Sequence, residues 1–311
     1  MVKIYMTKKG VLETVEEPQK GCWINMIHPT EKELIEIEEK YNIEADDLRA
    51  ALDEEEASRL TKEDDYTLVL VDVPNIEEKN GKNRFSTIPF GIIIAKSAII
   101  TVCLESTPVL NFAQKGKKNI IDTSLKTRML LQILLENAKL FLKYLRQINK
   151  QSEQLEIELQ KSIENPVLLD MMELGRSLLY FTTSLKGNNI VLEKLSKTTS
   201  VTRYEEDEDL FEDVMIETKQ ASEMSETYSG VINGMMDAYS SIISNNMNVV
   251  QKFIAIVAIV ITIPSMIFDA YGMNIEGVPF ENSKYAFVII VFASLFASYI
   301  VYQFFKHKKM F

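Results

Sequence analysis

Small and polar side chains recur at steps of three or four residues along the last third of the chain. A mean step of about 3.5 residues places them on one stripe of an α-helix. The oxygens of the polar members can accept hydrogen bonds from the water shell of a cation, a shell that Mg²⁺ gives up reluctantly. The stripe therefore predicts a path for a hydrated divalent cation. Its members are Asp237, Ser241, Ser244, Asn248, Gln251, Ala255, Ala258, Thr262, Ser265 and Asp269.

A tetrapeptide, Tyr271–Asn274, follows the stripe and separates two uncharged apolar runs, Phe253–Phe268 and Tyr285–Phe305. The second run has 21 residues, enough for a helix to cross the roughly 30 Å hydrocarbon core of a bilayer. The first has 16 residues and can be lengthened by the apolar residues before it and by Lys252, whose ammonium group can reach the interface. We predict two transmembrane helices. The mouth of the ion path then contains Tyr271, Gly272, Met273 and Asn274.

The charges that flank the two runs predict their orientation. The connection 269–284 carries three acidic residues against one lysine, whereas the tail 306–311 contains three lysines. Lysine and arginine are retained on the cytoplasmic side of membrane helices. We expect a multi-pass protein of the cell membrane with both termini in the cytoplasm and the tetrapeptide facing out.

Two readings of the stripe remain open. A polar stripe in a membrane helix must face protein or water, and one stripe cannot enclose water, so a pore requires several copies around an axis. Alternatively, small residues can simply allow close packing of helices. The pore is favoured because packing does not require Asn248, Gln251 or Asp269.

The residues upstream predict an α+β domain joined to a long helical stalk. Strands are expected at Cys22–Ile27, Tyr66–Val73, Phe90–Ala95 and Ala98–Leu104, and helices at Glu31–Tyr41 and Glu44–Glu56. Beyond Leu125 the apolar spacing is helical. Helices are expected at Leu125–Ile163, at Val167–Lys186 with 188–196 extending it or starting another, and from Tyr204 to Phe268. The last has 65 residues, or roughly 100 Å, a length that suits a stalk entering a bilayer.

Six segments follow from these patterns. They are an α/β domain at 1–124, a helical region at 125–202, a stalk that continues into the first membrane helix at 203–268, a loop at 269–284, the second membrane helix at 285–305 and a basic tail at 306–311.

Composition excludes several function classes. The formal net charge of −11 argues against nucleic-acid binding, which needs basic surfaces. Two isolated cysteines and two histidines leave little for a catalytic or zinc site, and no phosphate-binding GxxxxGK[ST] sequence occurs. The chain is therefore not expected to be an enzyme. A divalent ion crossing 100 mV gains about 4.6 kcal/mol, so voltage alone can drive uptake.

The tetrapeptide at the end of the penultimate run, the basic tail and the long stalk together resemble the CorA family of magnesium and cobalt channels. The segment Trp23-Ile24-Asn25 with Pro29-Thr30 is similar to the N-terminal segment of that family. The resemblance covers essentially the whole chain. It implies a homopentameric funnel with a cytosolic α/β domain, and transport of Mg²⁺ with Co²⁺ or Ni²⁺.

The resemblance also implies roles for single residues. Gly272, Met273 and Asn274 match the selectivity motif, whose asparagine receives hydrated Mg²⁺. Asn248 matches a pore asparagine, and Ser265 stands where the family usually has threonine. The remaining assignments concern the gate and the cytosolic pore: Thr262 replaces a bulky apolar gate residue, Ile254 is the remaining gate candidate, and Asp237 matches an acidic pore-lining position.

Regulation and ion choice follow from the same resemblance. Asp47 and Asp213 are similar to the carboxylates with which the family senses cytosolic Mg²⁺ between subunits. The residues after Asn274 depart from the usual magnesium pattern, and Gly277-Val278-Pro279 faintly resembles the zinc-transporting branch. Two alternatives therefore remain: a Zn²⁺ transporter of the same fold, and a membrane-anchored module that transports nothing.

Overall fold

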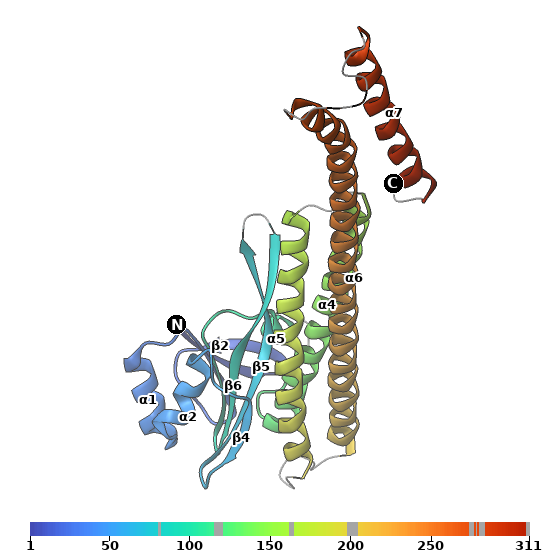
Figure 1. Cartoon of the computed structure of the whole chain (residues 1–311). Helices are drawn as coiled ribbons and strands as arrows, with labels where there is room; N and C mark the ends of the chain where they lie inside the picture. Colours follow the sequence, from blue (N-terminus) through green and yellow to red (C-terminus); the bar gives the residue numbers. More distant parts are fainter. Residues whose placement is uncertain are drawn as a thin grey trace. The chain divides into compact units, whose positions relative to one another are not determined.

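A computed structural model describes residues 1–79, 82–114, 121–161, 165–197, 205–273, 277, 279 and 284–308 (Figure 1). The chain forms two compact units, Met1–Gly234 and Met235–Phe311. The first contains the sheet, and the second contains the two apolar runs predicted to cross the membrane, whose helices are called the membrane-type helices below.

Within the described residues, seven strands of the first unit form one mixed sheet in the order β2-β1-β3-β7-β6-β5-β4. Only β3 and β7 pair in parallel among these neighbours. The strands are β1 Val2–Lys8, β2 Val11–Val15, β3 Cys22–Ile27, β4 Arg59–Lys62, β5 Tyr66–Lys79, β6 Lys82–Ala95 and β7 Ala98–Cys103. Because nearly every residue of the central strands β3 and β7 is buried, the sheet must be covered on both faces.

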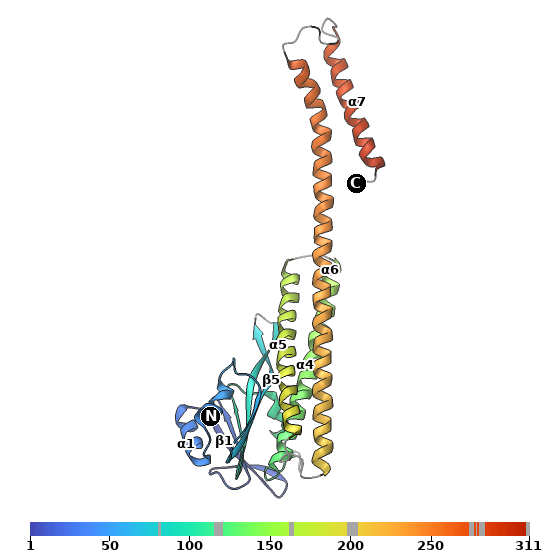
Figure 2. The ribbon, with the colours of Figure 1, turned by 60° about the horizontal axis from the view of Figure 1, so that its bottom comes forward.

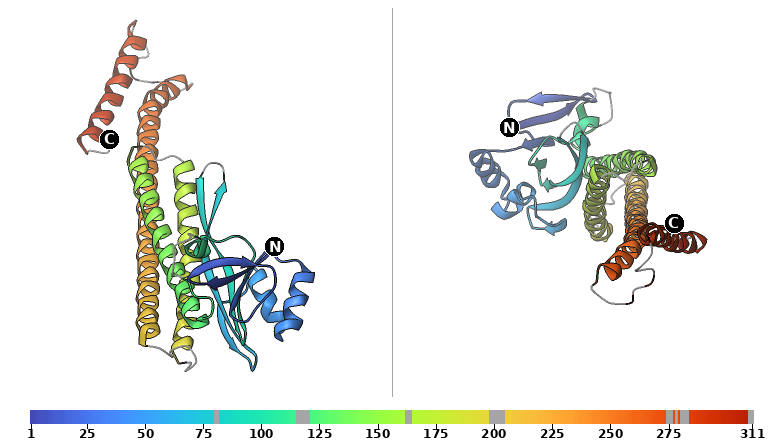
Figure 3. Two further views of the ribbon diagram at one scale, coloured as in Figure 1. Left: turned by 180° about the vertical axis from the view of Figure 1, so that it is seen from behind. Right: turned by 45° about the horizontal axis from the view of Figure 1, so that its top comes forward.

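The two faces of the sheet are covered by different helices. Helices α1 (Glu31–Tyr41) and α2 (Ala45–Arg49) bury Leu34, Ile37 and Leu48 in a core with Ile24 and Ile100 on one face. On the other face, α5 (Asn165–Ser196) lies beside β5 and β6, with α4 (Lys126–Lys161) next to it (Figure 2). The first unit therefore has three layers, as the right panel of Figure 3 shows.

Helix α6 (Glu205–Gly272) is one continuous helix of 68 residues, and α7 (Ala286–His307) follows it. The predicted stalk and both membrane-type helices are therefore confirmed, with ends that differ by a few residues. Helix α5 is also continuous, so 188–196 extends it. Gly187 lets α5 lie close to Ser58, because a Cβ at position 187 would be only 3.1 Å from Ser58 Oγ. Two short elements, η2 (Pro108–Leu110) and α3 (Asn111–Gln114), precede α4.

The predicted helix Glu44–Glu56 was wrong in its second half. Helix α2 ends at Arg49 and continues only as the 3₁₀ turn η1 (Ala50–Leu52). The reason is that 53–56 are four consecutive acidic residues, which provide no apolar side to bury against the sheet.

The strand predictions missed β1, β2 and β4, and made the hairpin β5–β6 too short. The predicted strand Tyr66–Val73 stops before Pro74, yet Pro74 pairs with Thr87 inside the hairpin. Strand β4 pairs with β5 only as far as Leu70, so Pro74 has no second neighbour that needs its missing N–H.

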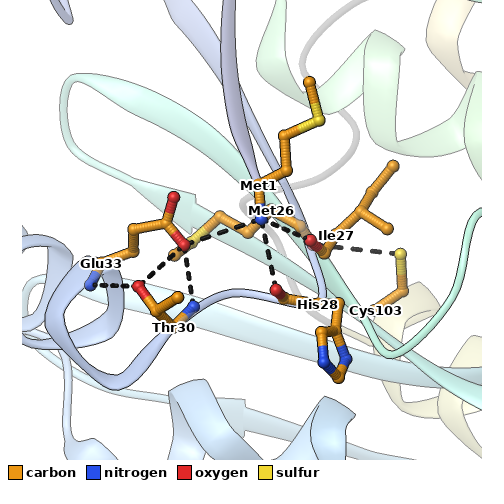
Figure 4. A network of polar contacts seen from close by, with 7 residues as sticks. All are labelled: Met1, Met26, Ile27, His28, Thr30, Glu33 and Cys103. Atoms are coloured by element: carbon orange, nitrogen blue, oxygen red, sulfur yellow. Dashed lines mark hydrogen bonds and ion pairs between the residues drawn. The ribbon is translucent and has the colours of Figure 1, made fainter.

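The start of α1 illustrates how local chemistry sets an element boundary (Figure 4). Thr30 N–H donates to Glu33 Oε2 at 2.8 Å, while Glu33 N–H donates to Thr30 Oγ1 at 3.4 Å, a complete capping box. The α-ammonium group of Met1 lies 3.6 Å from the same Glu33 oxygen. The hydrogen bond from the Thr30 backbone, more than any other contact, lowers the pKa of Glu33.

We expect Glu33→Gln to flatten the loss of folding stability at acid pH. The pKa of Glu33 is lower in the folded than in the unfolded chain. Its contribution is therefore complete above about pH 4.3, the unfolded value, and is lost as pH falls through the folded pKa. Glutamine keeps an acceptor for the cap but does not titrate. Urea unfolding between about pH 3 and pH 7 measures the difference. The exposed Glu36 on the same helix gives the control Glu36→Gln; equal slopes for both variants would contradict the expectation.

Candidate functional site

All ten members of the polar stripe are exposed on α6 in the single chain. The 235–272 part of α6 packs on α7 through a different face. Ile256 is 3 % exposed, and Ser294 and Ser298 of α7 are buried. From Ile256 to Thr262 the helix turns about 600°, so the two side chains point roughly 120° apart around the helix axis. The stripe is therefore not the surface that packs the two membrane-type helices together.

The hydroxyl groups of the stripe keep their acceptor lone pairs. Thr262 Oγ1 donates to Ala258 O at 2.8 Å, and Ser265 Oγ donates to Ile261 O at 3.4 Å. Since the proton of each hydroxyl is directed to the helix backbone, its lone pairs remain available. Water bound to a cation donates hydrogen bonds outward, so these oxygens suit a hydrated ion rather than a bare one.

The residues predicted to line the pore are exposed to solvent in the single chain. Ile254, the gate candidate, is 60 % exposed and lies next to the stripe on the helix surface. Asp237, Ser244, Asn248, Gln251 and Asp269 are likewise exposed in the single chain. These exposed positions are compatible with several copies of α6 around one axis.

The predicted mouth is only partly described. Tyr271 and Gly272 form the last turn of α6, and Met273 is 58 % exposed. Asn274 lies outside the described residues, so its role remains a prediction from the sequence.

The two predicted regulatory carboxylates differ in their surroundings. Asp47 is 7 % exposed and already bound: Arg59 Nη2 lies 3.1 Å from Oδ1, and Tyr66 Oη donates to Oδ2 at 2.8 Å. Burial, helped by that hydrogen bond, raises the pKa of Tyr66. Asp213 is exposed on α6. Among the described residues, no three His, Cys, Asp or Glu side chains lie close enough to hold a metal ion.

Sequence reasoning missed one contact inside the candidate membrane region. Pro264 interrupts the apolar part of α6, and Ser298 Oγ of α7 lies 3.2 Å from Val260 O, one helical turn before that proline. A proline in one apolar run and serines at i and i+4 in the other were the available signals. The partner of each depends on how the two helices meet.

Both α6 and α7 contain stretches long and apolar enough to cross a membrane. Residues 18–307 match the family model described as CorA-like Mg²⁺ transporter protein. The chain belongs to this family. Membership of a transporter family, together with the two apolar helices, makes it a membrane protein and confirms the prediction that it is not an enzyme.

Known relatives support the assignment along the whole chain. The chain is 28 % identical over 279 residues to the cobalt/magnesium transport protein CorA of Methanocaldococcus jannaschii, covering 88 % of this chain and 86 % of that protein. The complete structure of the CorA magnesium transporter from the same organism superposes with a TM-score of 0.82 over 98 % of this chain and 97 % of that one, at 24 % identity. The predicted α/β domain, long helix and two C-terminal apolar helices are thereby confirmed.

A more distant fold match is the cytoplasmic domain of a protein named ZntB. The cytoplasmic domain of ZntB from Vibrio parahaemolyticus superposes with a TM-score of 0.61, covering 78 % of this chain and 98 % of that domain, at 12 % identity. Such low identity shows a shared fold and carries no information about the transported ion.

Proposed function

We propose that the chain forms a homopentameric channel in the cell membrane for voltage-driven uptake of hydrated Mg²⁺, with Co²⁺ and Ni²⁺ as further substrates. The observation that carries the proposal is the exposed polar stripe of α6, which lies away from the face that packs on α7. The M. jannaschii relative, whose name specifies cobalt and magnesium transport, supports the choice of ions. The CorA resemblance supports five copies, and the flanking charges support cytoplasmic termini.

The mechanism uses oxygen atoms at successive depths. Asn274 would receive the hydrated ion at the outer mouth, and Ser265, Thr262 and Asn248 would accept hydrogen bonds from its water shell further in. Asp269 and Asp237 would raise the local cation concentration at the two ends. The membrane potential supplies about 4.6 kcal/mol per divalent ion at 100 mV.

Flux into liposomes tests this function. Purified protein is reconstituted, a negative interior potential is imposed with K⁺ and valinomycin, and entry is followed with dyes for Mg²⁺ and for Zn²⁺. We expect Mg²⁺ entry that increases with the potential. Zn²⁺ entry without Mg²⁺ entry would replace this proposal with the zinc alternative, and no flux of either ion would favour the membrane-anchored module.

Cytosolic Mg²⁺ is proposed to close the channel by binding between Asp47 of one copy and Asp213 of the next. Asp213 is free to meet a neighbour because its side chain is exposed. Asp47 would have to exchange its contact with Arg59 for the ion. Binding would then hold neighbouring copies together, and ion loss would release them.

We expect Asp213→Asn to weaken inhibition by Mg²⁺ on the cytosolic side. One lost carboxylate ligand should raise the half-inhibitory concentration roughly tenfold, the equivalent of about 1.4 kcal/mol. The measurement is flux into liposomes that contain graded Mg²⁺. Glu212→Gln, which removes the neighbouring exposed acid, is the control. The same inhibition curve for all three proteins would exclude Asp213 as a ligand.

A further inference from the structure

Pro264 leaves one backbone carbonyl of α6 without its helical partner. In an α-helix the N–H of residue i+4 donates to the carbonyl of residue i, and proline has no N–H. The carbonyl of Val260 therefore lacks its donor. The hydrocarbon region of a bilayer supplies no water to replace it, so another protein group is needed. The last turns of α6 bend away from the axis of the preceding turns (Figure 1), as expected near an interior proline.

Ser298 of α7 supplies that group. Ser298 is 7 % exposed, and its Oγ lies 3.2 Å from Val260 O and 3.0 Å from Ser294 O. The Ser294 carbonyl already accepts the backbone N–H of Ser298 within α7. The Val260 carbonyl has no such donor in its own helix. Donation of the Ser298 hydroxyl proton to Val260 O is therefore favoured, because it gives a hydrogen bond to a carbonyl that would otherwise lack one.

We propose that Ser298 is a positioning residue for the ion path: it fixes the bend of α6 at Pro264, between the stripe residues Thr262 and Ser265. The hydroxyl groups on either side of the bend point where the local axis of α6 directs them. A helix α7 that holds the freed carbonyl therefore sets the geometry of the path without contacting the ion. This inference rests on the proposed function.

A double-mutant cycle tests the proposal. Ser298→Ala should lower the maximum rate of Mg²⁺ uptake per folded channel by roughly three- to tenfold, while the half-saturating Mg²⁺ concentration, set at the outer mouth, is unchanged. Ser294→Ala is the matched control, because among the described residues Ser294 Oγ donates within its own helix, to Val291 O at 2.8 Å. Pro264→Ala restores an N–H for Val260. In that background Ser298→Ala should have no further effect.

The outcomes separate the two proposals. Wild-type protein without Mg²⁺ flux would overturn the proposed function. The role of Ser298 alone would be overturned if Ser298→Ala changed flux no more than Ser294→Ala does, or changed it equally with and without Pro264→Ala. Thermal unfolding of the same four cycle proteins in detergent gives a second measure of the coupling. This measurement can be made even if Pro264→Ala reduces transport. If the changes in Tm caused by Ser298→Ala and Pro264→Ala are additive, the proposal is also overturned.

A second inference concerns a cavity in the first unit. Asp72 of β5 lies two residues beyond the last pairing with β4, and side-chain amides take the place of the missing strand. Asn188 Oδ1 accepts from Asp72 N–H, and its Nδ2 donates to Asp72 O, both at 2.8 Å. Asn137 Nδ2 of α4 donates to the same carbonyl at 2.9 Å. Because Nδ2 of Asn137 must face a carbonyl, the orientation of its amide is fixed.

The other amide atom of Asn137 has no partner among the described residues. Asn137 is 4 % exposed, and its Oδ1 lacks a hydrogen bond beside a cavity with room for about one water molecule. The lining is apolar except for Asn137, Asn188 and Thr218 of α6. Thr218 Oγ1 donates to Val214 O at 2.7 Å, so toward the cavity it offers only lone pairs.

The geometry points to a binding site for a single water that donates one hydrogen bond to Asn137 Oδ1 and one to Thr218 Oγ1. The two acceptors match the two protons of a water molecule. A metal ion is a poor fit, since Mg²⁺ and Ca²⁺ need six or more oxygen ligands. Such a water would join α6 to α4 and, through the Asp72 carbonyl, to the edge of the sheet.

The effect of Thr218→Val on stability differs between a cavity that holds a water and one that is empty. Valine has the same shape without the acceptor, and losing a back-bond to Val214 is by itself neutral or favourable to the helix. If the water binds, the variant strands Asn137 Oδ1 and lowers the Tm of the full chain by roughly 2–8 °C. Thr218→Ser keeps the hydroxyl and should preserve the water. Thr227→Val is the control, because Thr227 makes the same back-bond to Glu223 at an exposed position of α6.

A map at a resolution that shows waters completes the test. We expect a peak within about 3.2 Å of both oxygens in wild type and in Thr218→Ser. An empty cavity, or a Thr218→Val protein as stable as Thr227→Val, would overturn the proposal.

Discussion

Asn274→Ala is expected to lower Mg²⁺ uptake at least tenfold without changing the folding of the protein. Each copy would lose an amide that can accept hydrogen bonds from the hydrated ion, worth about 1 kcal/mol. Because every copy in a ring loses it, even partial addition exceeds the roughly 1.4 kcal/mol that corresponds to tenfold. The variant removes no predicted packing contact, so expression and Tm should match wild type. Initial rates in liposomes at a fixed potential and subsaturating Mg²⁺ measure the effect.

The control for this variant is Asn282→Ala, which makes the same change in the same connection outside the tetrapeptide. A membrane-anchored module without a pore predicts equal behaviour of both variants. If Asn274→Ala takes up Mg²⁺ as fast as Asn282→Ala does, the tetrapeptide is not the mouth of the path.

The sequence predicted elements whose determinants are local. The capping box of α1 needs only Thr30 and Glu33, three residues apart, and its helix ends at the predicted residue, Tyr41. The polar stripe and both apolar runs are likewise periodic signals within single helices. The edge strand β2 alternates weakly and β4 has four residues, so their existence depends on pairing with distant neighbours.

The contacts that complete the candidate sites could not be predicted in this way. Asp47 was identified as an acidic residue, but its bonds to Arg59 and Tyr66 depend on how α2 lies against the strands. Ser298 meets Val260 across 38 residues, and Asn188 meets Asp72 across 116. Ser298 and Asn188 each interrupt a mostly apolar helix face. Such an interruption indicates that a partner is required and does not identify it.

Asn188→Leu is expected to be among the most destabilising substitutions in the first unit. Leucine has a similar volume, so the variant creates no large cavity, but it removes all hydrogen bonds of the 3 % exposed Asn188. The Asp72 carbonyl keeps Asn137 as a donor, whereas the Asp72 N–H loses its acceptor. Stranding buried polar groups at this edge should cost about 2–4 kcal/mol. For a unit of this size that corresponds to a Tm lower by roughly 4–16 °C.

Asn189→Leu makes the same chemical change one residue along α5, where the helix has turned by about 100° and the side chain is half-buried. It should alter stability by no more than about 0.5 kcal/mol. Ser58→Ala removes only the hydroxyl that donates to Asn188 Oδ1 at 3.2 Å and should fall between the two. If the three variants unfold together in urea, side-chain amides do not hold the edge of β5. The attachment of α5 to the sheet would then depend on its other contacts, which include the Ser184–Thr87 hydrogen bond and the Arg84–Glu173 ion pair.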